Sequence, residues 1–124
     1  MGWRSTLERT LASADALAAD EEIVSSALHG AQLAAQVQVG EVVTLSGVLR
    51  SVTYAPPGLR PQLVAELFDG SASVDVVWLG RRDINGIEPG TRLVLTGRVA
   101  GAERGGRLRI YNPGYTLLPR LRAS

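Results

Sequence analysis

The side chains best suited to chemistry in this chain of 124 residues are its arginines. All 13 basic residues are arginine, and lysine is absent. A guanidinium group is a planar fork that can bind a phosphate through two hydrogen bonds and can stack on a base. The codon usage of a high-GC genome explains the same preference more simply, because it requires no binding site. Arginine content therefore indicates phosphate binding only if the arginines gather on one face.

Charge is distributed unevenly along the chain. Residues 1–39 carry two arginines and five acidic residues, whereas residues 40–124 carry eleven arginines and seven acidic residues. The formal net charge of the whole chain is only +1. An acidic leader thus precedes a moderately basic body.

Few other residues could support catalysis or metal binding. The chain has one histidine, His29, and no cysteine, so it offers neither a thiolate metal site nor a conventional Ser-His-Asp triad. The carboxylates of Asp75, Asp83 and Glu88 are not spaced as metal ligands. We therefore expect no catalytic residue, no bound metal and no cofactor, and hence a protein that is not an enzyme.

The expected location is the cytoplasm. A chain without cysteine suits a reducing compartment. No apolar run approaches the roughly 18 residues of a membrane span, and the first ten residues, MGWRSTLERT, lack the apolar core of a secretory signal. No membrane partner is expected.

Residues 1–39 are expected to form a helical extension. Ser5 and Glu8 are spaced as a capping box at the start of a first helix, and a second short helix is expected from Asp20 to Gly30. The apolar stripe of the two helices consists of Leu7, Leu11, Ile23 and Leu28. Short helices are only marginally stable on their own, so this stripe is expected to pack on the rest of the protein or on a neighbouring chain.

From residue 41 the hydrophobic period changes to two, which indicates strands. Five strands are expected, over residues 41–53, 62–68, 73–79, 91–100 and 107–111. Gly47 lies inside the long first strand, where a small barrel commonly bends. The predicted fold class is an all-β, five-stranded Greek-key barrel at residues 40–118, with the helical extension before it and a tail at residues 119–124.

Three short motifs in this order resemble those of the OB-fold. The hairpin LFDGSASVDVVWL resembles the DG hairpin of OB domains in nucleic-acid enzymes, and IEPGTRLVLTGRV is similar to the segment that forms their fourth strand. The motif YNPGY resembles the ending of the wedge domain of RecG-type branched-DNA helicases. Over residues 41–115 the chain resembles the short actinobacterial OB-fold nucleic-acid-binding proteins. This resemblance implies non-catalytic binding of single-stranded or branched DNA, or of RNA, on strands 2 and 3 and the flanking loops.

The expected hairpin of residues 62–79 has an inner and an outer face. The most apolar register places Ala65, Leu67, Val74, Val76 and Trp78 inside. The outer face then carries Gln62, Val64, Glu66, Phe68, Ser73, Asp75, Val77 and Leu79. Phe68 is its one aromatic ring, and Glu66 and Asp75 would repel phosphate. Asp69 is expected to accept hydrogen bonds from backbone amides in the turn.

The candidate nucleic-acid-binding residues lie on this face and at the ends of the strands. They are Arg50, Tyr54, Arg60, Phe68, Arg81, Arg82, Arg104, Arg107 and Arg109. A solvated rim that keeps a small barrel soluble explains the arginines equally well. Tyrosines beside chain reversals, such as Tyr54, Tyr111 and Tyr115, more often cap a barrel than stack on a base.

The alternative function is a protein-interaction adaptor or an oligomerisation module. In that case the alanine-rich helices, or the outward apolar side chains of the hairpin, would dock a partner protein or a second copy. The small net charge and the two acidic residues on the outer face favour this alternative. The resemblance to OB domains favours nucleic acid.

Overall fold

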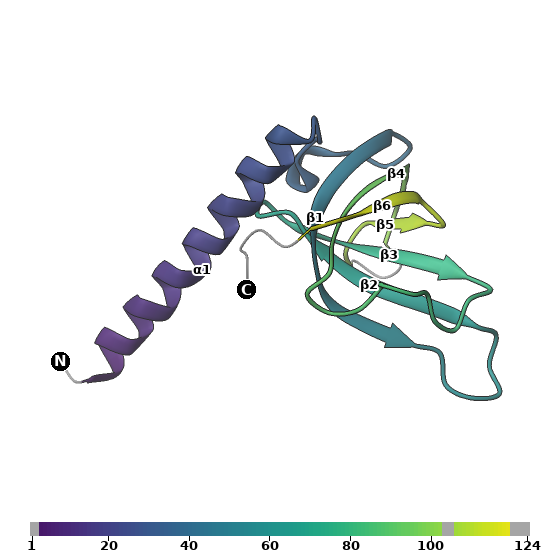
Figure 1. The fold of residues 1–124 in the computed structure, drawn as a ribbon, viewed down its shortest axis with the longest axis horizontal. Helices are drawn as coiled ribbons and strands as arrows, with labels where there is room; N and C mark the ends of the chain where they lie inside the picture. The colour runs from purple at the N-terminus through teal and green to yellow at the C-terminus, as the bar shows by residue number, and fades with distance from the viewer. Residues whose placement is uncertain (1–2, 103–105, 120–124) are drawn as a thin grey trace.

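A computed structural model describes the backbone of residues 3–102 and 106–119, with side chains from residue 16 onward in these ranges. This part of the chain contains one α-helix, one short 3-10 helix and six strands. The elements are α1 (Trp3–Leu28), η1 (Ala34–Gln36), β1 (Val42–Tyr54), β2 (Gln62–Phe68), β3 (Ser73–Leu79), β4 (Arg92–Ala100), β5 (Arg109–Tyr111) and β6 (Gly114–Leu118). Figure 1 shows α1 projecting from one side of a curved sheet, with its N-terminal half away from the strands.

The six strands form one closed sheet. Their order is β1-β2-β3-β5-β4-β6, and an additional pairing of β1 with β4 closes the sheet on itself. β3 and β5 are parallel, whereas the other pairs of described strands are antiparallel. Alternate side chains point to opposite faces of such a sheet, so one set fills its interior and forms the core.

The hairpin of β2 and β3 has the inward register that the sequence predicts. Its buried inward residues are Leu63, Ala65, Leu67, Val74, Val76 and Trp78. The Trp78 ring meets the Tyr115 ring edge-to-face, with centroids 5.7 Å apart. Val77 was expected to face solvent, yet it is fully buried. Its cross-strand neighbours on that face, Val64 and Tyr111, stand on either side of it.

Strand β1 is long because it pairs with two different strands. Val42 to Val48 pair with β4, and Val48 to Tyr54 pair with β2. Gly47 lies where the partner changes, and a side chain there would collide with the carbonyl of Phe68. The glycine that sequence analysis places at the bend is therefore required by this close backbone approach.

The structure has six strands where the sequence predicts five. The predicted strand at residues 107–111 is shorter, and the chain forms a further strand, β6, after it. Asn112 has a φ of 48°, and Pro113 has no amide hydrogen to donate to a ladder, so the chain is interrupted between β5 and β6. Both strands pair with β4, at successive parts of its length, which makes them two halves of one interrupted strand.

The N-terminal extension contains one helix rather than the two that the sequence predicts. Helix α1 has 26 residues and continues through Asp20 without a break. Neither glycine nor proline occurs between Trp3 and Leu28, so no residue there forces the helix to end. No helix in the described part of the chain is long and apolar enough to cross a membrane.

The side of α1 that meets the sheet is polar, so of the two expected positions for the apolar stripe, on the rest of the protein or on a neighbouring chain, the structure does not place Leu28 on the sheet. Glu22, Ser25 and Ser26 are buried, whereas Leu28 is 80 % exposed. Ile23 is half-buried beside Gly70. The side chains of Leu7 and Leu11 are not among those that the structure describes. The contact is polar because the start of β4 presents Arg92, which a helix can approach only with a counter-charge.

The Arg92 contact fixes the end of α1. Arg92 Nη2 lies 2.9 Å from Glu22 Oε2 and donates a second hydrogen bond of 2.9 Å to Ser25 Oγ. Both charged side chains are more than nine-tenths buried. Ser26 Oγ also donates to the carbonyl of Ser46 on β1 at 3.0 Å. These directional bonds determine which face of the helix is turned outward.

Asp69 joins the β2–β3 turn to the segment after α1. Its Oδ1 accepts hydrogen bonds from the amides of Ser71 and Ala72, at 2.9 and 3.1 Å, as the sequence predicts. Its Oδ2 accepts a 2.6 Å bond from the amide of Ala34, which the sequence does not predict. Ala34 and the nearby Val37 are thereby held in the hydrophobic core.

We expect Asp69→Ala to destabilise the fold by roughly 2–4 kcal/mol, because it leaves buried backbone amides without an acceptor. Asp83→Ala is the matched control, since Asp83 is exposed and its removal should change stability by about 0.5 kcal/mol or less. Urea unfolding followed by circular dichroism measures both changes. Equal losses in the two variants would show that the Asp69 bonds do not hold the fold together.

Candidate nucleic-acid interface

The outward side of β2, β3 and β5 forms the candidate surface, here called the β2–β3–β5 face. Pairing places Glu66 opposite Asp75 and places Asp75 beside Arg109. The face consists of Val64, Glu66, Phe68, Ser73, Asp75, Arg109 and Tyr111, with the fully buried Val77 beneath them. These residues come together because the side chains of paired residues share one side of the sheet.

The two carboxylates of this face are neutralised in part by Arg107. Arg107 Nη1 lies 3.0 Å from Asp75 Oδ1, and its Nη2 lies 3.6 Å from Glu66 Oε1. Ser73 Oγ also donates a 2.7 Å hydrogen bond to Glu66 Oε2. The Arg107 side chain is 49 % exposed, against 17 % and 18 % for the two acids. A ligand on this face therefore meets a guanidinium more readily than the two carboxylates.

Phe68 does not offer an open ring to a base. The guanidinium carbon of Arg50 lies 3.5 Å from the centre of the ring, as in a cation–π contact. The pairing of β1 with β2 shifts register between Leu49 and Ser51, so Arg50 lies at an irregularity that redirects its side chain. The accessible group is thus a stacked guanidinium, which can itself pair with phosphate or stack on a base.

A second group of arginines lies at the end of the hairpin where β2 begins and β3 ends. Gln62 pairs with Leu79 there, and the amide of Gly80 donates a 3.0 Å bond to the carbonyl of Pro61. The loop of residues 55–61 therefore lies beside the loop that follows β3. Arg60, Arg81 and Arg82 are all exposed on these two loops.

A cleft of about 350 Å³ opens beside the first of these loops. It is lined by Thr53, Tyr54, Ala55, Pro56, Leu59, Arg60, Gln62 and Val64. Tyr54 is 53 % exposed, which is more than either Tyr111 or Tyr115. An exposed ring next to an exposed arginine offers stacking and phosphate contact in one place.

The charge of these arginines is largely available to a ligand. No ion pair between described residues involves Arg50, Arg60, Arg81 or Arg82. Arg82 makes one long hydrogen bond, of 3.5 Å, to the carbonyl of Leu59. Arg109 donates to the Tyr111 hydroxyl at 3.4 Å. Arg104 lies outside the described residues.

Tyr111 belongs to the candidate surface, although sequence analysis favours a cap of the barrel over a base-stacking role for it and leaves it out of the candidate binding residues. It lies beside Val77 and is 38 % exposed. The parallel pairing of β5 with β3 brings it onto the face, and sequence alternation alone does not reveal which strands pair. Among the described residues, no three acidic or histidine side chains are grouped to hold a metal ion.

No family model matches this chain, and no curated protein matches it. Solved structures do share its fold. Asparaginyl-tRNA synthetase from Entamoeba histolytica matches with a TM-score of 0.59 and 17 % identity over 73 % of this chain and 23 % of that one. RecG bound to a three-way DNA junction matches with a TM-score of 0.52 and 26 % identity over 67 % of this chain and 12 % of that one.

The p204 HINb domain matches with a TM-score of 0.53 and 17 % identity over 68 % of this chain and 44 % of that one. The chain thus spans less than half the length of each of these three proteins. Together with the closed six-stranded sheet, these likenesses show that the chain has an OB-like fold.

Proposed function

We propose that this chain is a non-enzymatic, cytoplasmic OB-fold protein that binds single-stranded or branched nucleic acid. The binding surface is the β2–β3–β5 face together with the loops that carry Arg60, Arg81 and Arg82. Branched DNA is the first ligand to test, because RecG, with 26 % identity to this chain, was solved on a three-way DNA junction. RNA is a second ligand for the same surface.

The observation that carries this proposal is the set of exposed arginines without ion pairs beside an exposed ring. Arg60 and Arg81 lie on adjacent loops, and Tyr54 and Arg60 line the same cleft. An arginine near phosphate contributes a salt-dependent attraction, whereas an aromatic ring contributes stacking that depends little on salt. The two contributions can therefore be measured separately.

We expect Arg60→Ala and Arg81→Ala each to weaken binding of a fluorescein-labelled three-way DNA junction. Each lost phosphate contact should lower the slope of log affinity against log salt by about 0.7–0.9. Fluorescence anisotropy at several NaCl concentrations measures this slope. Arg98→Ala is the matched control, because Arg98 is exposed on β4 and its loss removes the same charge outside the proposed surface.

Two results would contradict this prediction. One is an equal fall in slope for Arg98→Ala, which would mean that net charge alone matters. The other is a dissociation constant weaker than about 100 μM for the unmodified protein at low salt, where even non-specific binding is stronger.

We expect Tyr54→Ala to weaken single-strand binding by about 1–3 kcal/mol, which is roughly 5- to 150-fold in Kd, with little change in the salt slope. Tyr54→Phe keeps the ring and should bind nearly as well as the unmodified protein. The same anisotropy assay with a labelled single strand gives both values. If Tyr54→Ala binds normally, the ring does not stack on a base and the cleft is not part of the surface.

A further inference from the structure

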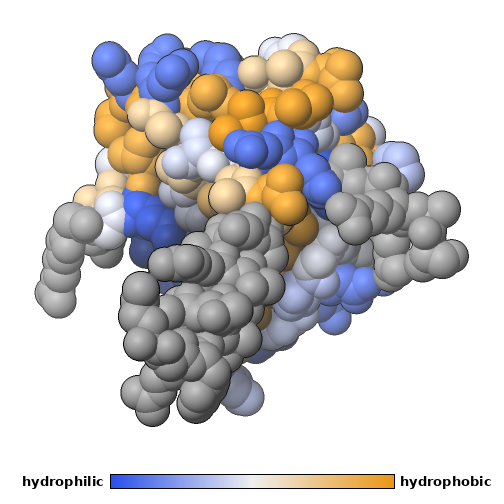
Figure 2. Space-filling view, turned by 90° about the vertical axis from the view of Figure 1, so that its left-hand side faces the viewer, coloured by the Kyte–Doolittle hydropathy of each residue, from blue (hydrophilic) through white to orange (hydrophobic). Residues whose placement is uncertain are grey.

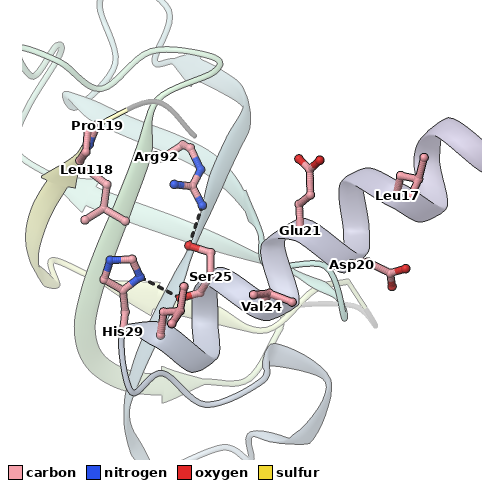
Figure 3. Close-up of a pocket in the computed structure, with 10 residues that line it drawn as sticks. Leu17, Asp20, Glu21, Val24, Ser25, His29, Arg92, Leu118 and Pro119 are labelled. Atoms are coloured by element: carbon pink, nitrogen blue, oxygen red, sulfur yellow. Dashed lines mark hydrogen bonds between the residues drawn. The ribbon is translucent and has the colours of Figure 1, made fainter. Parts of the chain in front are cut away.

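A groove runs between α1 and the end of β6. Its volume is about 590 Å³. The residues that line it are Leu17, Asp20, Glu21, Val24, Ser25, Leu28, His29, Arg92, Leu118 and Pro119. Figure 3 shows Leu118 and Pro119 on the sheet side, with Glu21, Ser25 and His29 on the helix side.

The apolar wall of this groove is supplied by α1 and has no cover in the described chain. Leu17, Val24 and Leu28 are 64 %, 59 % and 80 % exposed. Hydrophobic surface also follows the upper part of the face from which α1 projects (Figure 2). Contiguous exposed apolar surface of this kind marks contact sites on soluble proteins. The polar contacts of Glu22 and Ser25 with Arg92 hold this wall outward.

The sequence of α1 continues the apolar wall as a heptad repeat. Eight positions alternate in spacing between four and three residues: Trp3, Leu7, Thr10, Ala14, Leu17, Glu21, Val24 and Leu28. We call these eight positions the α1 seam. Six are apolar, and such a repeat, here sustained over more than three heptads, is the pattern of a coiled coil. A helix of 26 residues is about 39 Å long, and four of the eight seam positions line the groove, so the other half of the seam extends beyond it.

The seam is complementary to itself when two copies of α1 run antiparallel. One register places its apolar positions together in three layers, Trp3 with Leu28, Leu7 with Val24 and Ala14 with Leu17. The two polar positions, Thr10 and Glu21, then share the fourth layer. A parallel pair in register would instead bring two copies of Glu21 together, which is repulsive.

Charge also favours the antiparallel arrangement. The first twelve residues carry Arg4, Arg9 and Glu8, whereas residues 15–22 carry no basic residue and, besides Glu22, which is paired with Arg92, three acidic ones. Antiparallel pairing places the basic half of each helix beside the acidic half of the other. A two-fold pair of this kind is isologous and closes on itself as a dimer.

We propose that the protein is a dimer in which α1 pairs antiparallel with α1 of a second copy. The N-terminal half of each helix occupies the groove of the other copy. In this register positions 3 and 7 of the second copy come opposite Leu28 and Val24, which line the groove together with Leu118 and Pro119. None of the residues that line the groove belongs to the β2–β3–β5 face, so the dimer and the proposed nucleic-acid binding can be tested separately.

Light scattering coupled to size exclusion tests the dimer with the full chain. We expect a mass of twice 13.1 kDa for the unmodified protein at concentrations from about 1 to about 100 μM. Leu17→Glu should shift the mass to one chain. Ala16→Glu is the matched control, because Ala16 is an exposed neighbour in α1 that lies off the seam, and it should remain dimeric.

Leu17 is mostly exposed, so Leu17→Glu should leave thermal unfolding of the monomer unchanged and keep the comparison valid. A single-chain mass for the unmodified protein over the whole range would overturn the proposal, and the groove would then belong to another partner. A dimer that survives Leu17→Glu would also overturn it.

Cross-linking tests the antiparallel register. The chain has no cysteine, so Leu7→Cys and Val24→Cys each introduce a unique thiol. A short bis-maleimide should join Leu7→Cys chains to Val24→Cys chains in a mixed sample. Leu7→Cys alone should not cross-link, because the two thiols would lie about 25 Å apart along the helix pair. Efficient cross-linking of Leu7→Cys to itself would overturn the antiparallel arrangement.

Discussion

The buried carboxylate of Asp69 is the contact on which the arrangement of the molecule depends. One oxygen closes the β2–β3 turn through Ser71 and Ala72, and the other accepts the amide of Ala34. A single side chain thus joins the hairpin of the closed sheet to the segment that leads out of α1. Gly70, with a φ of 94°, keeps this junction compact, because a side chain there would strike Ala19 and Ile23 of α1. The helix is therefore docked at the turn and not loosely tethered.

The two surfaces of the protein follow from how arginines are paired. Arg92 is buried with Glu22 and Ser25, and this pairing turns the polar side of α1 inward and its apolar side outward. Arg107 covers the acids of the β2–β3–β5 face, and Arg50 covers Phe68. The arginines on the loops lack such partners among the described residues and remain available for phosphate. A dimer through α1 would present two such surfaces at once, which increases avidity for a branched or long strand.

Apolar residues at every second position predict the strands and the inward register of the hairpin. Residues at these positions, such as Leu67 and Val76, are buried. This pattern does not predict contacts between distant segments. Val77 is buried by its cross-strand neighbours, and Tyr111 reaches the candidate face only through a parallel pairing of β5 with β3. The helical period likewise identifies an apolar stripe on α1 but not which side meets the sheet. That orientation depends on Glu22 and on Arg92, which is 70 residues away.

The central claim is that nucleic acid binds the β2–β3–β5 face and its adjoining loops. Backbone amide shifts in ¹H–¹⁵N spectra, recorded while a short single strand is titrated into the labelled protein, test this directly. The account predicts the largest shift changes in β2, β3, β5 and the loops containing Arg60 and Arg81, with the amides of α1 nearly unchanged. Shift changes confined to α1 and the groove, or none at a ligand excess at low salt, would contradict it.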